Sequence, residues 1–95
     1  MNALGFLEVS GTVAAIEALD AMLKTADVKF LTWEKKLGGR LVTIIVKGSV
    51  SSVAEAVESG KVRANQITKT VASAVIANPH EEIMKMINLS AAKYN

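Results

Sequence analysis

The sequence has 95 residues, which is enough for one small domain with a thin core. Hydrophobic residues make up 51% of the chain, more than so small a monomer normally buries, so we expect part of this apolar surface to face a partner. The formal net charge of +2 gives no reason to expect broad nucleic-acid binding. The absence of cysteine excludes disulfides, thiolate metal ligands and cysteine nucleophiles.

No stretch of the sequence is suited to a membrane or to secretion. The apolar run over residues 41–46 is interrupted by Thr43 and is far shorter than the roughly 20 residues that a membrane-spanning helix needs. The first residues lack a basic segment and reach Glu8 too soon for a secretion signal. We therefore expect a cytoplasmic protein.

The first half of the chain predicts a strand, a helix and a β-hairpin. Residues 3–9 are apolar at nearly every position, which is typical of a strand covered on both faces. From residue 13 to residue 26 apolar side chains recur every three or four positions, which predicts an amphipathic helix packed on a sheet. Residues 28–36 and 40–47 are rich in β-branched and aromatic residues, and the glycine pair between them suits a turn with positive φ.

The second half predicts a helix and a last strand. Ser52 and Glu55, three residues apart, form a capping box that we expect to open the second helix. Residues 71–77 then predict a strand that is apolar on both faces and is stopped by the Asn-Pro pair that follows.

A short helix is predicted after this strand. Asn78 can cap it, Pro79 suits its first position, and Glu81 falls at its third. We expect this helix over residues 79–87, within a C-terminal appendage of residues 79–95.

The predicted order is strand, helix, strand, strand, helix, strand. This is the α/β (α+β) arrangement known as split βαβ or ferredoxin-like, in a single domain over residues 1–95 with its C-terminal appendage. Such a sheet carries helices on one face only. Because the predicted strands have no polar face, we expect the tail or a neighbouring subunit to cover the other face.

Few residues suggest catalysis or metal binding. His80 is the only histidine, so a closed zinc site lacks ligands, and a polar residue in the first turn of a helix is the simpler interpretation. The acidic pairs Glu81-Glu82 and Glu55 with Glu58 are predicted in the first turns of helices, where the helix dipole favours them. No glycine-rich nucleotide-binding motif occurs. We predict no catalytic residue, no metal and no cofactor.

The hairpin carries cations and two aromatic residues. Lys35, Lys36 and Arg40 surround the glycine pair and could hold an anion, although taken alone a solvated hairpin tip is the simpler interpretation. Phe30 and Trp33 are predicted on opposite faces of their strand, so they make no stacking platform for bases and are better interpreted as core or interface anchors.

Several runs of the sequence, in order, resemble the single-domain shell proteins of bacterial microcompartments. These runs are residues 3–8 (ALGFLE), 14–18 (AAIEA), 20–24 (DAMLK), 33–35 (WEK), 41–48 (LVTIIVKG) and 75–80 (VIANPH). The resemblance implies cyclic homohexamers that tile edge to edge into a polyhedral shell around metabolic enzymes in the bacterial cytoplasm. The implied partners are copies of the same chain, sister shell proteins and the enclosed enzymes, with no nucleic acid and no membrane.

The resemblance also implies two functional regions. One matches the loop that lines a central pore on the six-fold axis and comprises Lys36, Leu37, Gly38, Gly39 and Arg40. The other is the edge at which hexamers meet and comprises Lys24, Asp27, Asn78, Pro79 and His80. Without the resemblance, Lys24 would be interpreted as a surface ion pair with Asp20.

The sequence departs from the family's usual pattern in both regions. The family often has arginine at Asn78, asparagine near Asp27 and aspartate at Ser49, so we expect weaker or differently paired edge contacts here. The usual pore loop is Gly-Ser-Gly, and this one is longer and more basic. We therefore expect a pore that favours anionic small metabolites over neutral ones.

Two other classes of function stay open at this point. Ferredoxin-like domains also serve as small-molecule sensors that bind an effector between subunits, but no effector domain is attached. A small enzyme such as an acylphosphatase needs a phosphate-cradling loop ahead of a helix, and residues 10–12 (SGT) are too sparse for that. Fold alone does not separate these classes.

Overall fold

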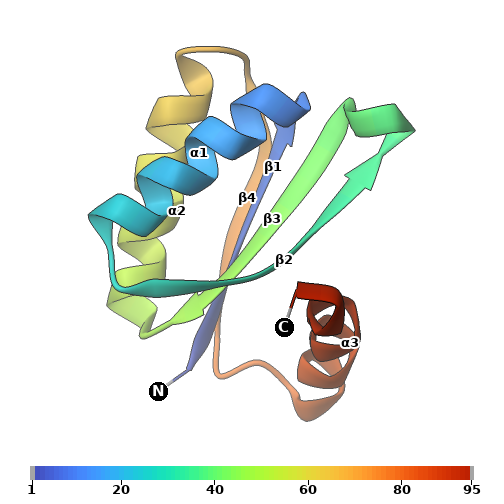
Figure 1. Ribbon diagram of the computed structural model, residues 1–95. Coiled ribbons are helices and arrows are strands. Elements are labelled where there is room, and N and C mark those ends of the chain that lie inside the picture. Colours follow the sequence, from blue (N-terminus) through green and yellow to red (C-terminus); the bar gives the residue numbers. More distant parts are fainter. Residues whose placement is uncertain (1, 95) are drawn as a thin grey trace.

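The computed structural model describes residues 2–94, which form a four-stranded sheet with helices on both faces (Figure 1). The elements in chain order are β1 (Ala3–Ser10), α1 (Thr12–Thr25), β2 (Val28–Lys36), the 3-10 turn η1 (Leu37–Gly39), β3 (Leu41–Gly48), α2 (Val50–Asn65), β4 (Thr70–Ala77), α3 (Glu81–Ala91) and the 3-10 turn η2 (Ala92–Tyr94). The strands are antiparallel to their neighbours, in the order β2-β3-β1-β4. This order confirms the predicted ferredoxin-like fold.

The main core lies between the sheet and the pair α1 and α2 (Figure 1). Because side chains alternate along a strand, every second residue of β1 and β3 points toward these helices. Leu7 and Ile44 are fully buried there against Met22 of α1 and Val53 of α2. The two helices therefore cover one face of the sheet completely enough to exclude water from its centre.

The opposite face is covered in part by α3 (Figure 1). Leu4 and Ile45 are buried there beneath Ile87 of α3. Thr32 is buried and forms a hydrogen bond of 2.8 Å to Ser90 of the same helix. The tail therefore supplies some of the cover that the apolar strands predicted for this face.

β4 is an exposed edge strand. Seven of its eight residues are exposed, and its sequence TVASAVIA contains no charged side chain. It pairs with β1 on one side only. Its outer edge and much of both faces are therefore open to a partner.

The start of α2 differs from the prediction. Ser49 is the N-cap residue, since its hydroxyl accepts a hydrogen bond of 3.2 Å from the backbone N–H of Ser52. The predicted capping box of Ser52 and Glu55 is therefore wrong. Glu55 and Glu58 lie beyond the first turn of α2, so the prediction that both sit there is wrong as well.

The start of α3 also differs from the prediction. His80 is the N-cap residue, and its Nδ1 accepts a hydrogen bond of 3.0 Å from the backbone N–H of Glu82. Asn78 does not cap the helix; it adopts φ 48° and its N–H donates to the Asn2 carbonyl oxygen at 2.8 Å. Pro79 lies before the helix, which ends at Ala91 and not at residue 87.

A bulge in β2 changes the faces of its aromatic side chains. The register against β3 shifts just after Phe30, so that Leu31 has no partner there. Phe30 pairs with Val46 and Trp33 with Ile44, and both pairs point toward α1 and α2. The prediction of opposite faces is wrong because the extra residue shifts the alternation of side chains by one position, which turns Trp33 to the same face as Phe30. Both aromatic residues pack against the core, as predicted.

Candidate functional site

The two regions singled out in the sequence lie beyond opposite ends of the sheet. One end is marked by residues that the strand register aligns across all four strands, Val28, Gly48, Ala3 and Ala77. At the other end Lys36 and Ser10 both pair with Leu41. Strands of this length separate the two ends by roughly 25 Å. The turn between β2 and β3, which holds Lys36 to Arg40, lies at one end, and the start of β2 and the end of β4 lie at the other (Figure 1). Asp27 directly precedes β2 and Asn78 directly follows β4.

The loop between β2 and β3 is a tight turn with a left-handed backbone. Leu37, Gly38 and Gly39 have φ values of 55°, 68° and 94°. The predicted positive φ of the glycine pair is confirmed. Leu37 was not expected to share it, because a β-carbon disfavours this conformation.

This loop is fastened to the start of α1. The Gly11 N–H donates to the Arg40 carbonyl oxygen at 2.9 Å, and the Thr12 hydroxyl donates to the Gly39 carbonyl oxygen at 3.4 Å. A β-carbon at Gly39 would lie 2.7 Å from the Thr12 hydroxyl oxygen, so only glycine allows this approach. Nothing in the sequence indicated these contacts, since 27 residues separate Thr12 from Gly39.

The cations of the loop are not neutralised within the described chain. Lys35, Lys36 and Arg40 are exposed and take part in none of the ion pairs formed among residues 2–94. The Lys35 ammonium lies 5.3 Å from the centre of the Trp33 ring, which favours it only weakly at an exposed site. The loop therefore presents uncompensated positive charge at one end of the molecule.

At the opposite end, Lys24 is exposed and already paired on its own helix. Its Nζ lies 2.8 Å from Asp20 Oδ2, and 75% of its side chain is exposed. The hydrogen bond and the negative charge of Asp20 raise the pKa of Lys24 above its ordinary value. The attraction of this pair is therefore fully present below the ordinary lysine pKa and is lost only as pH rises through the raised value. The ion pair predicted for Lys24 is confirmed, and its ammonium keeps an open side.

The other edge residues lie along the same end without forming one cluster. Asp27 precedes β2, and Asn78, Pro79 and His80 follow β4. Because β2 and β4 are the outer strands, roughly 14 Å of sheet separates the two groups. A single chain therefore presents the edge residues as two exposed groups.

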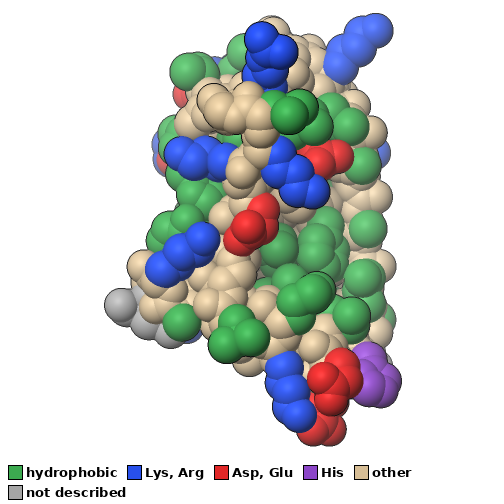
Figure 2. Space-filling model, turned by 90° about the vertical axis from the view of Figure 1, so that its right-hand side faces the viewer, with side chains coloured by type: hydrophobic (Ala, Val, Ile, Leu, Met, Phe, Trp, Pro, Cys, Tyr) green, Lys and Arg blue, Asp and Glu red, His purple; other side chains and the backbone are tan. Residues whose placement is uncertain are grey.

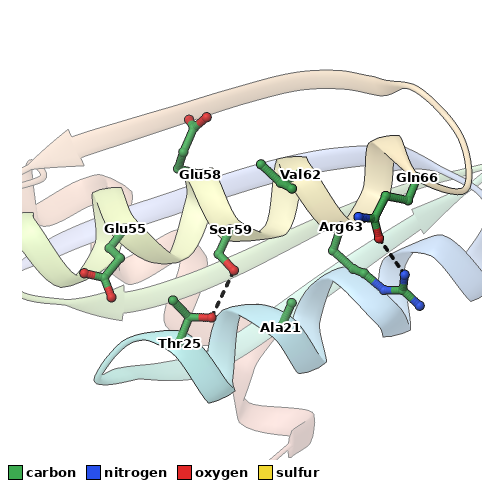
Figure 3. A pocket seen from close by; sticks show the side chains of 8 residues that line it. All are labelled: Ala21, Thr25, Glu55, Glu58, Ser59, Val62, Arg63 and Gln66. Carbon is green, nitrogen blue, oxygen red and sulfur yellow. Dashed lines mark hydrogen bonds between the residues drawn. The ribbon is translucent and has the colours of Figure 1, made fainter.

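A groove of about 540 Å³ lies between α1 and α2 (Figure 3). Thr25 and Ser59 form a hydrogen bond of 3.0 Å across it. Arg63 donates to Gln66 at 2.7 Å and forms an ion pair with Glu17 at 2.8 Å. The two hydroxyl groups thus pair with each other and Arg63 pairs with Gln66 and Glu17, while the carboxylates of Glu55 and Glu58 also line the groove.

Over residues 2–94, no group of three or more His, Cys, Asp or Glu side chains is placed to hold a metal ion. Over the same residues, no helix is long and apolar enough to cross a membrane.

Comparison with known proteins agrees with the geometry. Residues 3–79 match the profile of the BMC domain. The bacterial microcompartment shell protein PduA of Citrobacter freundii is 42% identical over 86 residues, which cover 90% of this chain and 91% of PduA. The bacterial microcompartment shell protein EutM of Salmonella typhimurium is 41% identical over 90 residues, which cover 95% of this chain and 93% of EutM.

A solved structure gives the same result. A microcompartment protein from Desulfitobacterium hafniense DCB matches 95% of this chain with a TM-score of 0.81 and 29% sequence identity. The match covers 48% of that protein, so this chain spans about half its length. With a family profile over most of its residues and relatives of its own length, the chain belongs to the BMC-domain family of bacterial microcompartment shell proteins.

Proposed function

We propose that this chain is a structural tile of a bacterial microcompartment shell, which closes into cyclic homohexamers that join edge to edge and pass small metabolites through a central pore. In this role it makes and breaks no bond. It works in the bacterial cytoplasm, beside sister shell proteins and around the enclosed enzymes. The relatives are named as shell proteins, which supports the shell role, and their names give no support to the sensor alternative.

The observation that carries this proposal is the exposed strand β4. Its side chains Val71, Val75 and Ile76 are 53%, 39% and 41% exposed. Edge strands of monomeric proteins are normally protected by charge, proline or a covering element, because an open apolar edge pairs with other chains. Figure 2 shows hydrophobic side chains along the edge of the molecule above the single histidine, His80. Such a strand is expected in a subunit whose edge is covered by its neighbour.

The placement of the two site regions supports a ring. A subunit of a flat ring has one end near the symmetry axis and the other at the rim. The basic glycine loop and the edge residues lie beyond opposite ends of the sheet, as such a subunit requires. We assign Lys36, Leu37, Gly38, Gly39 and Arg40 to the pore, and Lys24, Asp27, Asn78, Pro79 and His80 to the joint between hexamers.

Self-association is tested at β4. We expect the parent protein to be a hexamer in light scattering, and Ile76→Lys to shift it toward monomer because the substitution places a charge on the strand that would be covered. Ala54→Lys, at an exposed position of α2, adds the same charge on another surface and should leave the hexamer intact. A parent protein that stays monomeric at high concentration would overturn the proposal.

Pore selectivity is tested at Arg40. Six copies of this guanidinium and of the Lys36 ammonium around one axis raise the local concentration of anions. We expect Arg40→Glu to lower the flux of a small dianion through reconstituted shells at least several-fold, and Lys85→Glu, an equal charge change at an exposed position of α3, to leave it unchanged. Equal flux through parent and Arg40→Glu shells would remove the anion preference from the proposal.

A further inference from the structure

Two lysines face each other on neighbouring strands. Lys29 of β2 and Lys47 of β3 are direct partners in the antiparallel register. Facing residues of such a pair have β-carbons about 5 Å apart, and like charges at this distance destabilise the sheet. An arrangement of this kind calls for a counter-charge.

The chain does not supply that counter-charge from its described part. Five of its eleven lysine and arginine side chains form ion pairs with acidic residues, namely Lys24, Lys61, Arg63, Lys85 and Lys93. Lys29 and Lys47 form none with any residue from 2 to 94. Glu34, which also lies on β2, already contacts Lys93 and Ser90.

The two lysines open into one cavity of about 250 Å³ between the sheet and the C-terminal helices. Its other walls include Asn88 of α3 and Tyr94 of η2. The Phe30 ring, which also packs against the core beneath α1 and α2, makes an edge contact with the Tyr94 ring, with 5.5 Å between their centres, so that Tyr94 lies against the outer strand β2. The residues around this one hollow thus include two lysines, an asparagine and a tyrosine.

We propose that this cavity binds a phosphate group, either inorganic phosphate or the phosphate of a small monoester, between Lys29 and Lys47. A phosphate carries about 1.5 to 2 negative charges at neutral pH and several acceptor oxygens, which suit two ammonium groups and the neutral donors of Asn88 and Tyr94. A single carboxylate balances only one of the two cations. Because Asn88 and Tyr94 belong to the tail, the bound anion also fastens α3 and η2 to the sheet.

This site is distinct from the basic loop assigned to the pore. Lys29 and Lys47 lie one residue from the end of the sheet marked by Val28 and Gly48, and the loop lies beyond the other end. The inference therefore stands or falls independently of the proposed pore.

Phosphate binding is tested by thermal unfolding of the full chain in inorganic phosphate or glycerol 1-phosphate, with sodium chloride at matched ionic strength as the reference. We expect phosphate to raise Tm by several degrees above the chloride reference, and Lys47→Gln and Lys29→Gln to weaken binding at least tenfold in ³¹P NMR titration. The two ligands distinguish a site for the free ion from one for a monoester. The control is Lys36→Gln, which removes the same charge at the loop between β2 and β3 and should bind phosphate as tightly as the parent does.

Without phosphate the same variants should respond in the opposite direction. Removing either lysine relieves the repulsion across the strands, so we expect Lys29→Gln to have a slightly higher Tm than the parent in chloride and a lower one in phosphate. An equal Tm of the parent in phosphate and in chloride would overturn the proposal, as would an equal loss of binding in Lys36→Gln.

Discussion

Leu37 adopts a left-handed backbone conformation between a strand and a glycine pair. Its φ of 55° is unfavourable for leucine by about 1–2 kcal/mol, and its side chain is 69% exposed, so burial offsets little of this strain. The turn is nevertheless maintained, because both of its ends are held by β2 and β3 and its carbonyl groups are bound by Gly11 and Thr12.

This strain predicts the effect of substitutions at Leu37. We expect Leu37→Asn to raise the free energy of unfolding by roughly 0.5–1 kcal/mol in urea denaturation, because asparagine tolerates this conformation better. Leu37→Val has a β-branched side chain and should lower the free energy of unfolding instead. If both variants unfold at the urea concentration of the parent, the loop stores no strain at this residue.

For single residues, the sequence predicted those backbone conformations that depend only on the type of residue. The glycine pair at 38 and 39 tolerates positive φ wherever it stands, so the turn could be expected from the sequence. Leu37 could not, because leucine rarely adopts this conformation and only the contacts of the folded loop impose it. The same holds for Asn78, which has both a capping side chain and a tolerance for positive φ, and which uses the second here.

At the scale of elements, the helix starts show where local patterns are ambiguous. Three serines precede or open α2, and each can cap a helix by its chemistry. The structure uses Ser49, whose hydroxyl accepts from the Ser52 backbone N–H and donates to the Ser52 hydroxyl at 2.9 Å. Starting the helix there makes Val50 a helical residue and packs it against the core. Tertiary packing therefore selects among equivalent caps.

Substitution of the serines distinguishes the two caps. We expect Ser49→Ala to lower the free energy of unfolding by about 1 kcal/mol, because an N–H at the start of α2 loses its acceptor. Ser52→Ala should have a smaller effect, since the Ser52 backbone N–H that donates to Ser49 is kept. The measurement is urea denaturation followed by circular dichroism. The opposite order of the two effects would support the capping box of Ser52 and Glu55.

The bulge in β2 is a second feature that alternation could not predict. Counting by two placed Phe30 and Trp33 on opposite faces, and one unpaired residue between them reversed the result. The strand boundaries did follow from the sequence to within one residue, because β-branched runs and glycine turns mark them directly, and the sheet agrees with the ferredoxin-like arrangement that the order of elements predicted. A bulge has no comparable signature in the residues, since its position depends on the neighbouring strand.

At the scale of the whole molecule, composition predicted a partner and the structure locates the surface open to one. The excess of apolar residues could not be assigned to a position by counting. The fold leaves β4 at the edge of the sheet, uncharged and open, while Lys35, Lys36 and Arg40 surround the loop and Lys24 lies in the last turn of α1. The apolar surface of β4 would hold a ring together, and the charged ends would govern what the ring contacts. Closure of the ring and tiling of rings into sheets can therefore be separated by mutation.

Lys24→Asp separates ring closure from tiling. The side chain is exposed and its partner Asp20 lies on the same helix, so the fold and the β4 edge should tolerate the substitution. If two hexamers meet with Lys24 of one against Lys24 of the other, two Lys24–Asp20 pairs balance their charges in the parent, whereas the substitution leaves four carboxylates and no ammonium at that joint. We expect light scattering to find hexamers and electron microscopy to find no extended sheets. The control Lys61→Asp breaks an ion pair with Glu58 on α2 and should keep both the hexamers and the sheets. If Lys24→Asp still forms sheets, or if Lys61→Asp loses them equally, the joint lies elsewhere.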